Sequence, residues 1–306
     1  MALLDRSIVR VLPAVPRPIV RRISGRYIAG SGLPDAIRVV KDLNAQGKMA
    51  TIDVLGEESA SRRETLDIVR AYHDVFEAIE RERLDSNVSV KLTGLGLNLA
   101  YELCRANLEK VVRHAAESGN FVRIDMEDAT CTSDTLQLYR EVREAGLDNV
   151  GIVLQAYLRR TIRDIRSLAP LRPNVRLCKG IYVEPPLIAY RDFDEVRENF
   201  VRSLDELLGG GSYVGIATHD AWLISQGQRL VEQHGLTREQ YEFQMLLGVT
   251  QRAGDRLVRD GHRLRIYVPF GKEWYRYSIR RLQENPKIAG YIAADTVDRV
   301  FGRNGA

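Results

Sequence analysis

Residues 49–92 read MATIDVLGEESASRRETLDIVRAYHDVFEAIERERLDSNVSVKL, and their pattern decides the fold. A short β-rich run, Met49–Leu55, is followed by an amphipathic stretch with helical spacing, Ser59–Arg83, and then by a second β-rich run, Val88–Leu92. A strand, a helix and a strand in this order predict a parallel βαβ unit.

The same alternation continues along the rest of the chain. Further strands are predicted at Phe121–Met126, Val150–Leu154, Asn174–Cys178, Tyr213–Thr218, Tyr241–Met245 and Leu264–Val268, with helices such as Leu99–Ser118, Ser133–Ala145 and Asp194–Leu208 between them. Eight units in about 260 residues match a (β/α)8 barrel better than an open doubly wound sheet. Several of the strands are apolar nearly throughout, as expected for strands that are buried on both faces. The predicted fold class is therefore α/β, a TIM-type barrel.

The composition fits one large globular domain. The 306 residues are 44% hydrophobic and 28% charged, which excludes disordered and collagen-like chains. No Pro/Gly/Ser-rich linker divides the sequence, so we predict a catalytic barrel over residues 47–306 and a basic helical arm over residues 1–46. Cys104, Cys131 and Cys178 form no CxxC pair, which indicates neither a disulfide framework nor a zinc cluster and favours a reducing cytoplasm.

The positive charge is concentrated in the arm. The whole chain carries +4, which is too little to indicate binding of nucleic acid, whereas residues 1–28 contain six arginines and one acid. No apolar stretch approaches the roughly 18 residues of a membrane span. Three interpretations stay open. The arm lies on an anionic membrane surface, it is similar to a transit peptide, being rich in arginine and poor in acids, or it is a solvated helical arm on the barrel, broken by prolines.

Polar residues follow every predicted strand, at the end where TIM barrels carry their catalytic groups. They are Asp53, Glu57, Lys91, Asp125, Glu127, Gln155, Lys179, Thr218, His219, Asp220, Gln244 and Tyr267. So many polar strand ends favour a buried ligand site over unrelated ion pairs. Lys91 and Lys179 are either Schiff-base nucleophiles or cations for an anionic ligand. His219 lacks metal-ligand spacing to another histidine and is expected to form hydrogen bonds.

The last predicted helix points to a carboxylate ligand. Tyr277, Arg280, Arg281 and Glu284 stand at i, i+3, i+4 and i+7, on one continuous face. Two guanidinium groups on one face can bind one carboxylate, so we predict a small carboxylic acid as substrate. Gly94 and Gly96 lack the third glycine of a dinucleotide motif, which argues against a Rossmann NAD site.

The run Ile266–Gly271 (IYVPFG), together with the four helix residues above, resembles the signature of the FAD-dependent proline dehydrogenases. Seven further blocks occur in the order of that family: DVLGE at 53–57, VKLT at 90–93, RIDME at 123–127, LQAY at 154–157, RLCKG at 176–180, ATHD at 217–220 and EFQML at 242–246. The resemblance implies a distorted (β/α)8 barrel that holds FAD at its C-terminal mouth. It implies oxidation of L-proline to Δ1-pyrroline-5-carboxylate by hydride transfer to the flavin, the first step of proline catabolism to glutamate, with a membrane quinone as electron acceptor.

The resemblance also implies roles for single residues. Asp125 and Arg176 resemble catalytic residues of the family, and Glu57 with Arg176 resembles the ion pair that gates the site. The implied substrate contacts are Lys91, Arg280 and Arg281 on the carboxylate, and Tyr267, Tyr277 and Leu246 around the ring. The implied flavin contacts are Met126, Gln155, Arg176, Lys179, Gly180, Ile181, Thr218, His219 and Glu284, and no metal is expected.

Other functions are open on the same residues. A Schiff-base lyase would act through Lys91 or Lys179, and a sensor would bind proline without turnover. Folate reductases are also flavin barrels, but they give no reason for paired arginines on the last helix. We expect a cytoplasmic enzyme, held at the inner face of the membrane if the arm binds lipid.

Overall fold

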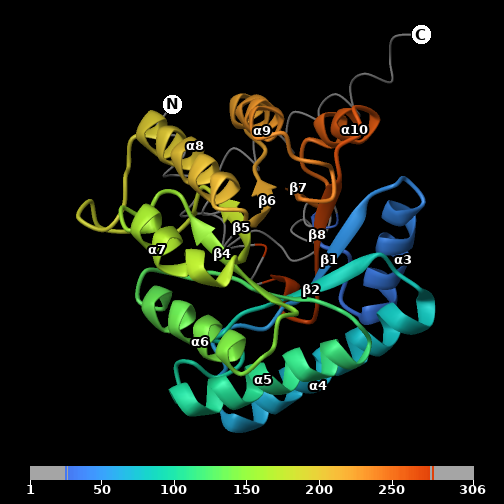
Figure 1. Ribbon diagram of the computed structural model, residues 1–306. Coiled ribbons are helices and arrows are strands. Elements are labelled where there is room, and N and C mark those ends of the chain that lie inside the picture. The colour runs from blue at the N-terminus through green and yellow to red at the C-terminus, as the bar shows by residue number, and fades with distance from the viewer. Residues whose placement is uncertain (1–24, 26, 276–277, 279–306) are drawn as a thin grey trace, which may run out of the picture.

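A computed structural model of the protein describes residues 25, 27–275 and 278, and these form a closed barrel of eight parallel strands surrounded by helices (Figure 1). The strands are β1 (Met49–Val54), β2 (Ser86–Val90), β3 (Val122–Ile124), β4 (Val150–Gln155), β5 (Asn174–Cys178), β6 (Tyr213–Ala217), β7 (Tyr241–Leu246) and β8 (Leu264–Phe270). Each overlaps a strand predicted from the sequence, so the (β/α)8 barrel is confirmed.

Apart from the first, the α-helices with described bounds each follow a strand, as predicted. They are α3 (Leu33–Asn44), α4 (Arg62–Glu82), α5 (Tyr101–Glu117), α6 (Thr132–Glu144), α7 (Thr161–Leu168), α8 (Phe193–Gly209), α9 (Ala221–Gln233) and α10 (Gln251–Arg259). The first turn shows why a boundary differs from the prediction. Ser61 accepts a hydrogen bond from Glu64 N, and Glu64 accepts one from Ala60 N, so this capping pair starts α4 at Arg62 instead of Ser59.

Helix α3 belongs to the outer ring of the barrel. It precedes β1 in sequence and packs against both β1 and β8, where β1 and β8 pair to close the sheet. This helix comes from the segment that the sequence analysis placed in the arm, and three of its residues (Ala36, Val40 and Leu43) are buried in the core. The basic part of the arm lies almost wholly outside the described residues.

The strands have two buried faces of different character. Ile52, Val90 and Phe243 belong to the apolar core that the strands share with the helices. On the other face, Arg176 of β5 contacts Ser89 of β2 at 3.0 Å. Because β2 and β5 are not neighbours in the sheet, this contact crosses the inside of the barrel. The apolar character expected for the strands is therefore found on their outward face, whereas much of the inward face is polar.

In the part of the chain that the structure describes, none of the helices combines the length and the apolar character that crossing a bilayer would take.

Candidate active site

An ion pair joins β1 to the residue after β2 at the C-terminal mouth of the barrel. Lys91 Nζ lies 2.8 Å from each carboxylate oxygen of Asp53, which is fully buried. Burial alone would lower the pKa of Lys91, but the carboxylates of Asp53 and Asp125 raise it above its ordinary value. Lys91 therefore stays protonated, whereas a Schiff-base nucleophile needs a free amine. An ammonium group has three donors, so one remains for a ligand after two contacts with Asp53.

A second ion pair spans the mouth. Asp125, directly after β3, accepts hydrogen bonds from Arg176 Nη1 at 2.6 Å and from the Tyr267 hydroxyl at 2.8 Å. The Arg176 guanidinium also contacts Ser89 Oγ and lies 5.2 Å from the centre of the Tyr267 ring. One guanidinium thus links side chains of β2, β5 and β8 with the residue after β3, and each of these contacts restrains its position.

Gln155, the last residue of β4, carries a buried acceptor without a partner. Its side-chain nitrogen is within 3.4 Å of the carbonyl oxygen of Met126 and 3.3 Å of that of Glu127. Among the described residues, no donor reaches its buried Oε1. Leaving such an acceptor unpaired costs about 1–3 kcal/mol, so the geometry favours a ligand that donates a hydrogen bond here.

The side of the mouth near β5 and β6 is more open and carries two cations. Lys179 Nζ lies 3.3 Å from Asp220, and Arg197 of α8 binds the same carboxylate at 2.9 and 2.8 Å. Burial would raise the pKa of Asp220, but Arg197 and Lys179 lower it to about 2. The Arg197 guanidinium also stacks over the exposed rings of Phe193 and Trp222. Arg197 also lies 3.8 Å from the exposed carboxylate of Asp194. The ammonium and guanidinium groups suit an anionic group such as a phosphate.

His219, a predicted flavin contact, forms a hydrogen bond with Leu246, which is predicted to enclose the substrate ring. The backbone N–H of Leu246 donates to His219 Nε2 at 2.9 Å. This nitrogen is therefore an acceptor, and the proton of the neutral ring sits on Nδ1. Within the described part of the chain, no group of three or more His, Cys, Asp and Glu side chains could hold a metal ion.

Other predicted residues lie around the same mouth. Thr218 and Met126 are buried, and Ile181 is 37% exposed at the start of the loop after β5. Gly180 has a φ of +99°, and a Cβ there would lie 2.1 Å from the Tyr157 ring, so a larger residue would collide with this ring. Four predicted residues, Tyr277, Arg280, Arg281 and Glu284, lie outside the described residues and stay predictions.

The gating ion pair also stays a prediction. The carboxylate that pairs with Arg176 in this structure is that of Asp125. Glu57 lies half-buried on the loop after β1, on the rim of the same mouth.

Several polar residues inside the barrel escaped the sequence analysis, among them a carboxylate, a guanidinium and a hydroxyl. Glu242, Arg265 and Ser89 are buried, and Arg265 Nε lies 2.7 Å from Glu242 Oε1. The sequence did carry a signal for them, since each stands two positions before a polar strand-end residue. Side chains two apart on a strand share a face, so this spacing marks a polar inward face.

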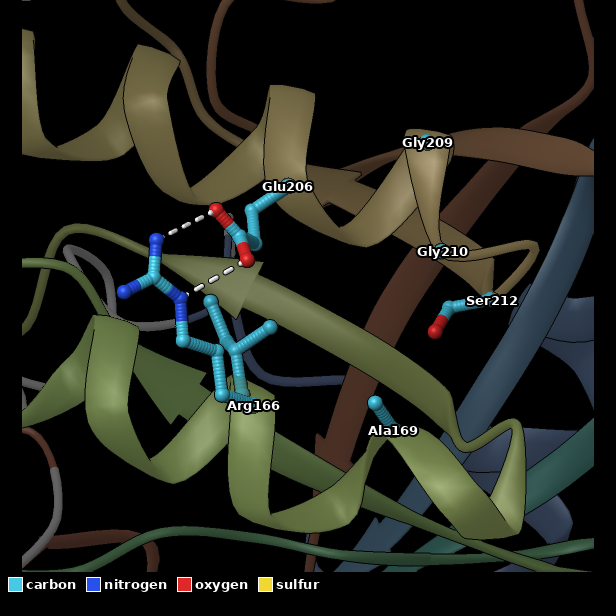
Figure 2. Close-up of a pocket in the computed structure, with 7 residues that line it drawn as sticks. Arg166, Ala169, Glu206, Gly209, Gly210 and Ser212 are labelled. Carbon is cyan, nitrogen blue, oxygen red and sulfur yellow. Dashed lines mark hydrogen bonds and ion pairs between the residues drawn. The ribbon is translucent and has the colours of Figure 1, made fainter.

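A cavity of about 420 Å³ lies elsewhere, outside the barrel and between α7 and α8 (Figure 2). Ser212, one of its lining residues, directly precedes β6, so the cavity lies at the N-terminal end of the strands, opposite the mouth. Its polar feature is the exposed ion pair of Arg166 and Glu206, which neutralise each other. We therefore place the site at the mouth.

Comparison with known proteins shows the family of the chain. The sequence model described as proline dehydrogenase matches residues 36–293. The chain belongs to the proline dehydrogenase family. It is 37% identical to proline dehydrogenase 1 of Bacillus subtilis (strain 168) over 267 residues, 87% of this chain and 88% of that protein. It is 35% identical to the proline dehydrogenase of Deinococcus radiodurans over 294 residues, 92% and 95% of the two chains. The resemblance seen in the sequence is confirmed, and with it a proline dehydrogenase function.

A solved structure shows the same fold. Proline utilization A from Bdellovibrio bacteriovorus, crystallised after inactivation by N-propargylglycine, superposes with a TM-score of 0.82 at 25% identity. The match covers 91% of this chain and 36% of that one, so this chain spans about a third of the length of that protein.

Proposed function

We propose that this member of the family is an FAD-dependent enzyme that oxidises L-proline to Δ1-pyrroline-5-carboxylate and passes the electrons to a quinone. The observation that carries the proposal is the pair of buried cation–carboxylate contacts at the mouth, Lys91 with Asp53 and Arg176 with Asp125. A buried site with fixed cations suits a small anionic substrate that must be held without rotational slack.

The substrate carboxylate would be bound by three cations. Lys91 has one donor beyond its contacts with Asp53, and Arg280 with Arg281 would supply the guanidinium forks. Tyr267, Tyr277 and Leu246 would then enclose the pyrrolidine ring. Asp53 acts through Lys91, because it holds the ammonium in position and keeps it charged.

The residues of the mouth fit a flavin. The unpaired Oε1 of Gln155 can accept a hydrogen bond from the polar edge of an isoalloxazine ring. Lys179 and Arg197 would bind the pyrophosphate, and Arg176 would supply a cation to the isoalloxazine ring. When bound, the flavin supplies the acceptor for the hydride that leaves C5 of proline. The proline nitrogen loses its proton in the same oxidation, which leaves the C5=N double bond of the product.

Purification gives the first test of the proposal. The protein should be yellow, should lose its colour when L-proline is added without oxygen, and should yield a product two hydrogens lighter by mass spectrometry. N-propargylglycine, which inactivated the Bdellovibrio protein, should inactivate this one too. A colourless protein that borohydride traps on its substrate would support a Schiff-base lyase instead. Binding of proline without turnover would support a sensor.

The quinone, the cytoplasmic location and the role of the basic arm are parts of the same proposal. The six arginines of residues 1–28 suit an anionic bilayer in which a quinone is dissolved. Deletion of residues 1–28 should weaken binding to anionic liposomes and leave activity with a soluble electron acceptor intact. Unchanged liposome binding would show that the arm is not a membrane contact.

A further inference from the structure

Gln244 of β7 reaches across a strand inside the barrel. Its Oε1 accepts a hydrogen bond from Arg176 Nε, although Arg176 lies on β5 and β6 runs between the two strands. Its Nε2 donates to Glu242, two residues earlier on the same face of β7. All three side chains are at least nine-tenths buried.

The charged groups on either side of the Gln244 amide, Glu242 and Arg176, allow the amide only one orientation. An ionised carboxylate can only accept hydrogen bonds and a guanidinium can only donate them. Burial would raise the pKa of Glu242, but Arg265 together with the hydroxyl of Tyr213 lowers it to about 2. The amide nitrogen must therefore face Glu242, and the amide oxygen must face Arg176.

A glycine on the intervening strand makes room for this reach. Gly215 of β6 pairs in register with Arg176 on one side and with Glu242 on the other. A Cβ at position 215 would lie 2.3 Å from Gln244 Nε2, well inside contact distance. Any other residue would push the amide away from Arg176.

We propose that Gln244 is a positioning residue that aims the Arg176 guanidinium at Asp125, with Glu242 orienting the amide and Gly215 leaving the space. Arg176 Nε is held from β7, so Nη1 is presented to Asp125 and Ser89. The catalytic meaning of this aim rests on the proposed function, in which Arg176 lies beside the flavin and the substrate.

The geometric claim can be tested without activity. In crystals of Gln244→Met, which keeps the length of the side chain and removes both hydrogen bonds, the 2.6 Å contact between Arg176 and Asp125 should be lost. An unmoved guanidinium would overturn the proposal. If the wild-type protein failed to oxidise L-proline, the proposed function would fail while this comparison of structures kept its meaning.

Kinetics test whether the aim matters for turnover. Gln244→Met should lower kcat by between about tenfold and a hundredfold, the range expected for a misplaced group, with a much smaller change in KM. In an Arg176→Lys background the same substitution should add little, because two residues that act through one contact are not additive. Multiplicative losses would show that Gln244 acts independently of Arg176 and would refute the proposal.

Matched variants separate positioning from packing. Gln137→Met removes an exposed hydrogen bond to Glu141 on α6 and should leave kcat unchanged. Gly215→Ala should reproduce the loss in kcat with a folded protein, whereas Gly209→Ala, whose Cβ would have 3.5 Å to its nearest neighbour, should not. Full activity of a folded Gly215→Ala would contradict the proposal.

Discussion

The two faces of strand β7 are both buried, but one makes apolar contacts and the other makes hydrogen bonds. Phe243 points to the helices and packs against α9, whereas its neighbours Glu242 and Gln244 form hydrogen bonds inside the barrel. Apolar contacts are non-directional, but hydrogen bonds require defined distances and angles. The outer face therefore stabilises the barrel, and the inner face fixes the directions of the groups at the mouth.

Loss of Lys91 should have the largest effect, because it damages both stability and the site. Lys91→Met leaves the fully buried Asp53 without its cation, and such a broken pair costs about 3–5 kcal/mol. Urea denaturation should show this loss, and oxidation of L-proline should fall strongly. Lys41→Met, which breaks an exposed pair with Glu82 on the outside, is the control. Equal stability of the two variants would contradict the assignment.

Phe243→Ala should separate the two faces of β7. Phe243 is 1% exposed and contacts the His262 ring edge-on, and removal of such a buried ring costs about 3–5 kcal/mol. The free energy of unfolding should drop by this amount while kcat of the folded protein stays at the wild-type value. A large loss in kcat at full folding would mean that the outer face also orients the site.

Arg281→Met tests the predicted carboxylate clamp. Breaking one partner of a buried charge pair costs about 2–5 kcal/mol, which corresponds to roughly 30-fold or more in kcat/KM for L-proline. The FAD content of the purified protein should be largely retained. Normal oxidation of L-proline by this variant would show that Arg281 does not bind the substrate carboxylate.

The loss of stability at acid pH should depend on Glu242, a buried carboxylate on the inner face of β7. The pKa of Glu242 is lowered from 4.5 to about 2, so its stabilising contribution is complete above pH 4.5 and is lost as the pH falls towards 2. Glu242→Gln should be less stable at neutral pH and should lose less stability in acid, as measured by urea denaturation across this range. Glu232→Gln, which changes an exposed side chain on α9, should keep the wild-type curve. An unchanged curve for Glu242→Gln would show that this carboxylate is not stabilised in the folded state.

The smallest effect is expected at the outer ion pair in Figure 2. Arg166 and Glu206 are both partly exposed, with 66% and 34% of their side chains accessible. Exposed pairs contribute about 0–1 kcal/mol, so Arg166→Ala should barely change the melting temperature and should leave kcat/KM unchanged. A marked loss of activity would show that the cavity between α7 and α8 is coupled to the mouth.

The strand order was predictable because, in a parallel barrel, β-rich runs alternate along the sequence with amphipathic helical stretches. The β-rich runs at Met49–Leu55 and Val88–Leu92 correspond to β1 and β2, and polar residues after the strands marked the mouth. Asp53 with Lys91 illustrates the limit of this reasoning. The sequence placed both at strand ends, but their pairing depends on the register that brings Asp53 beside Ser89.

The polar interior was harder to predict because the apolar outer face dominates the pattern of each strand. Arg265 and Glu242 stand between apolar residues and look like isolated charges, until the closed barrel brings them together at 2.7 Å. Arg197 lies in the second turn of α8, where a charge is ordinarily solvated. Its contact with Asp220 arises only from the packing of α8 against α9. Contacts between distant segments of this kind have no local signal in the sequence.

The central claim is that the inward-facing side chains at the mouth of the barrel bind the carboxylate of L-proline and thereby hold its pyrrolidine ring in place for oxidation. The most direct test is the anaerobic bleaching of the purified flavoprotein by L-proline compared with L-prolinamide, which lacks the charged carboxylate. We predict rapid, saturable bleaching by L-proline and far slower bleaching by the amide. Absence of bleaching by L-proline, or equal rates with both compounds, would contradict the account.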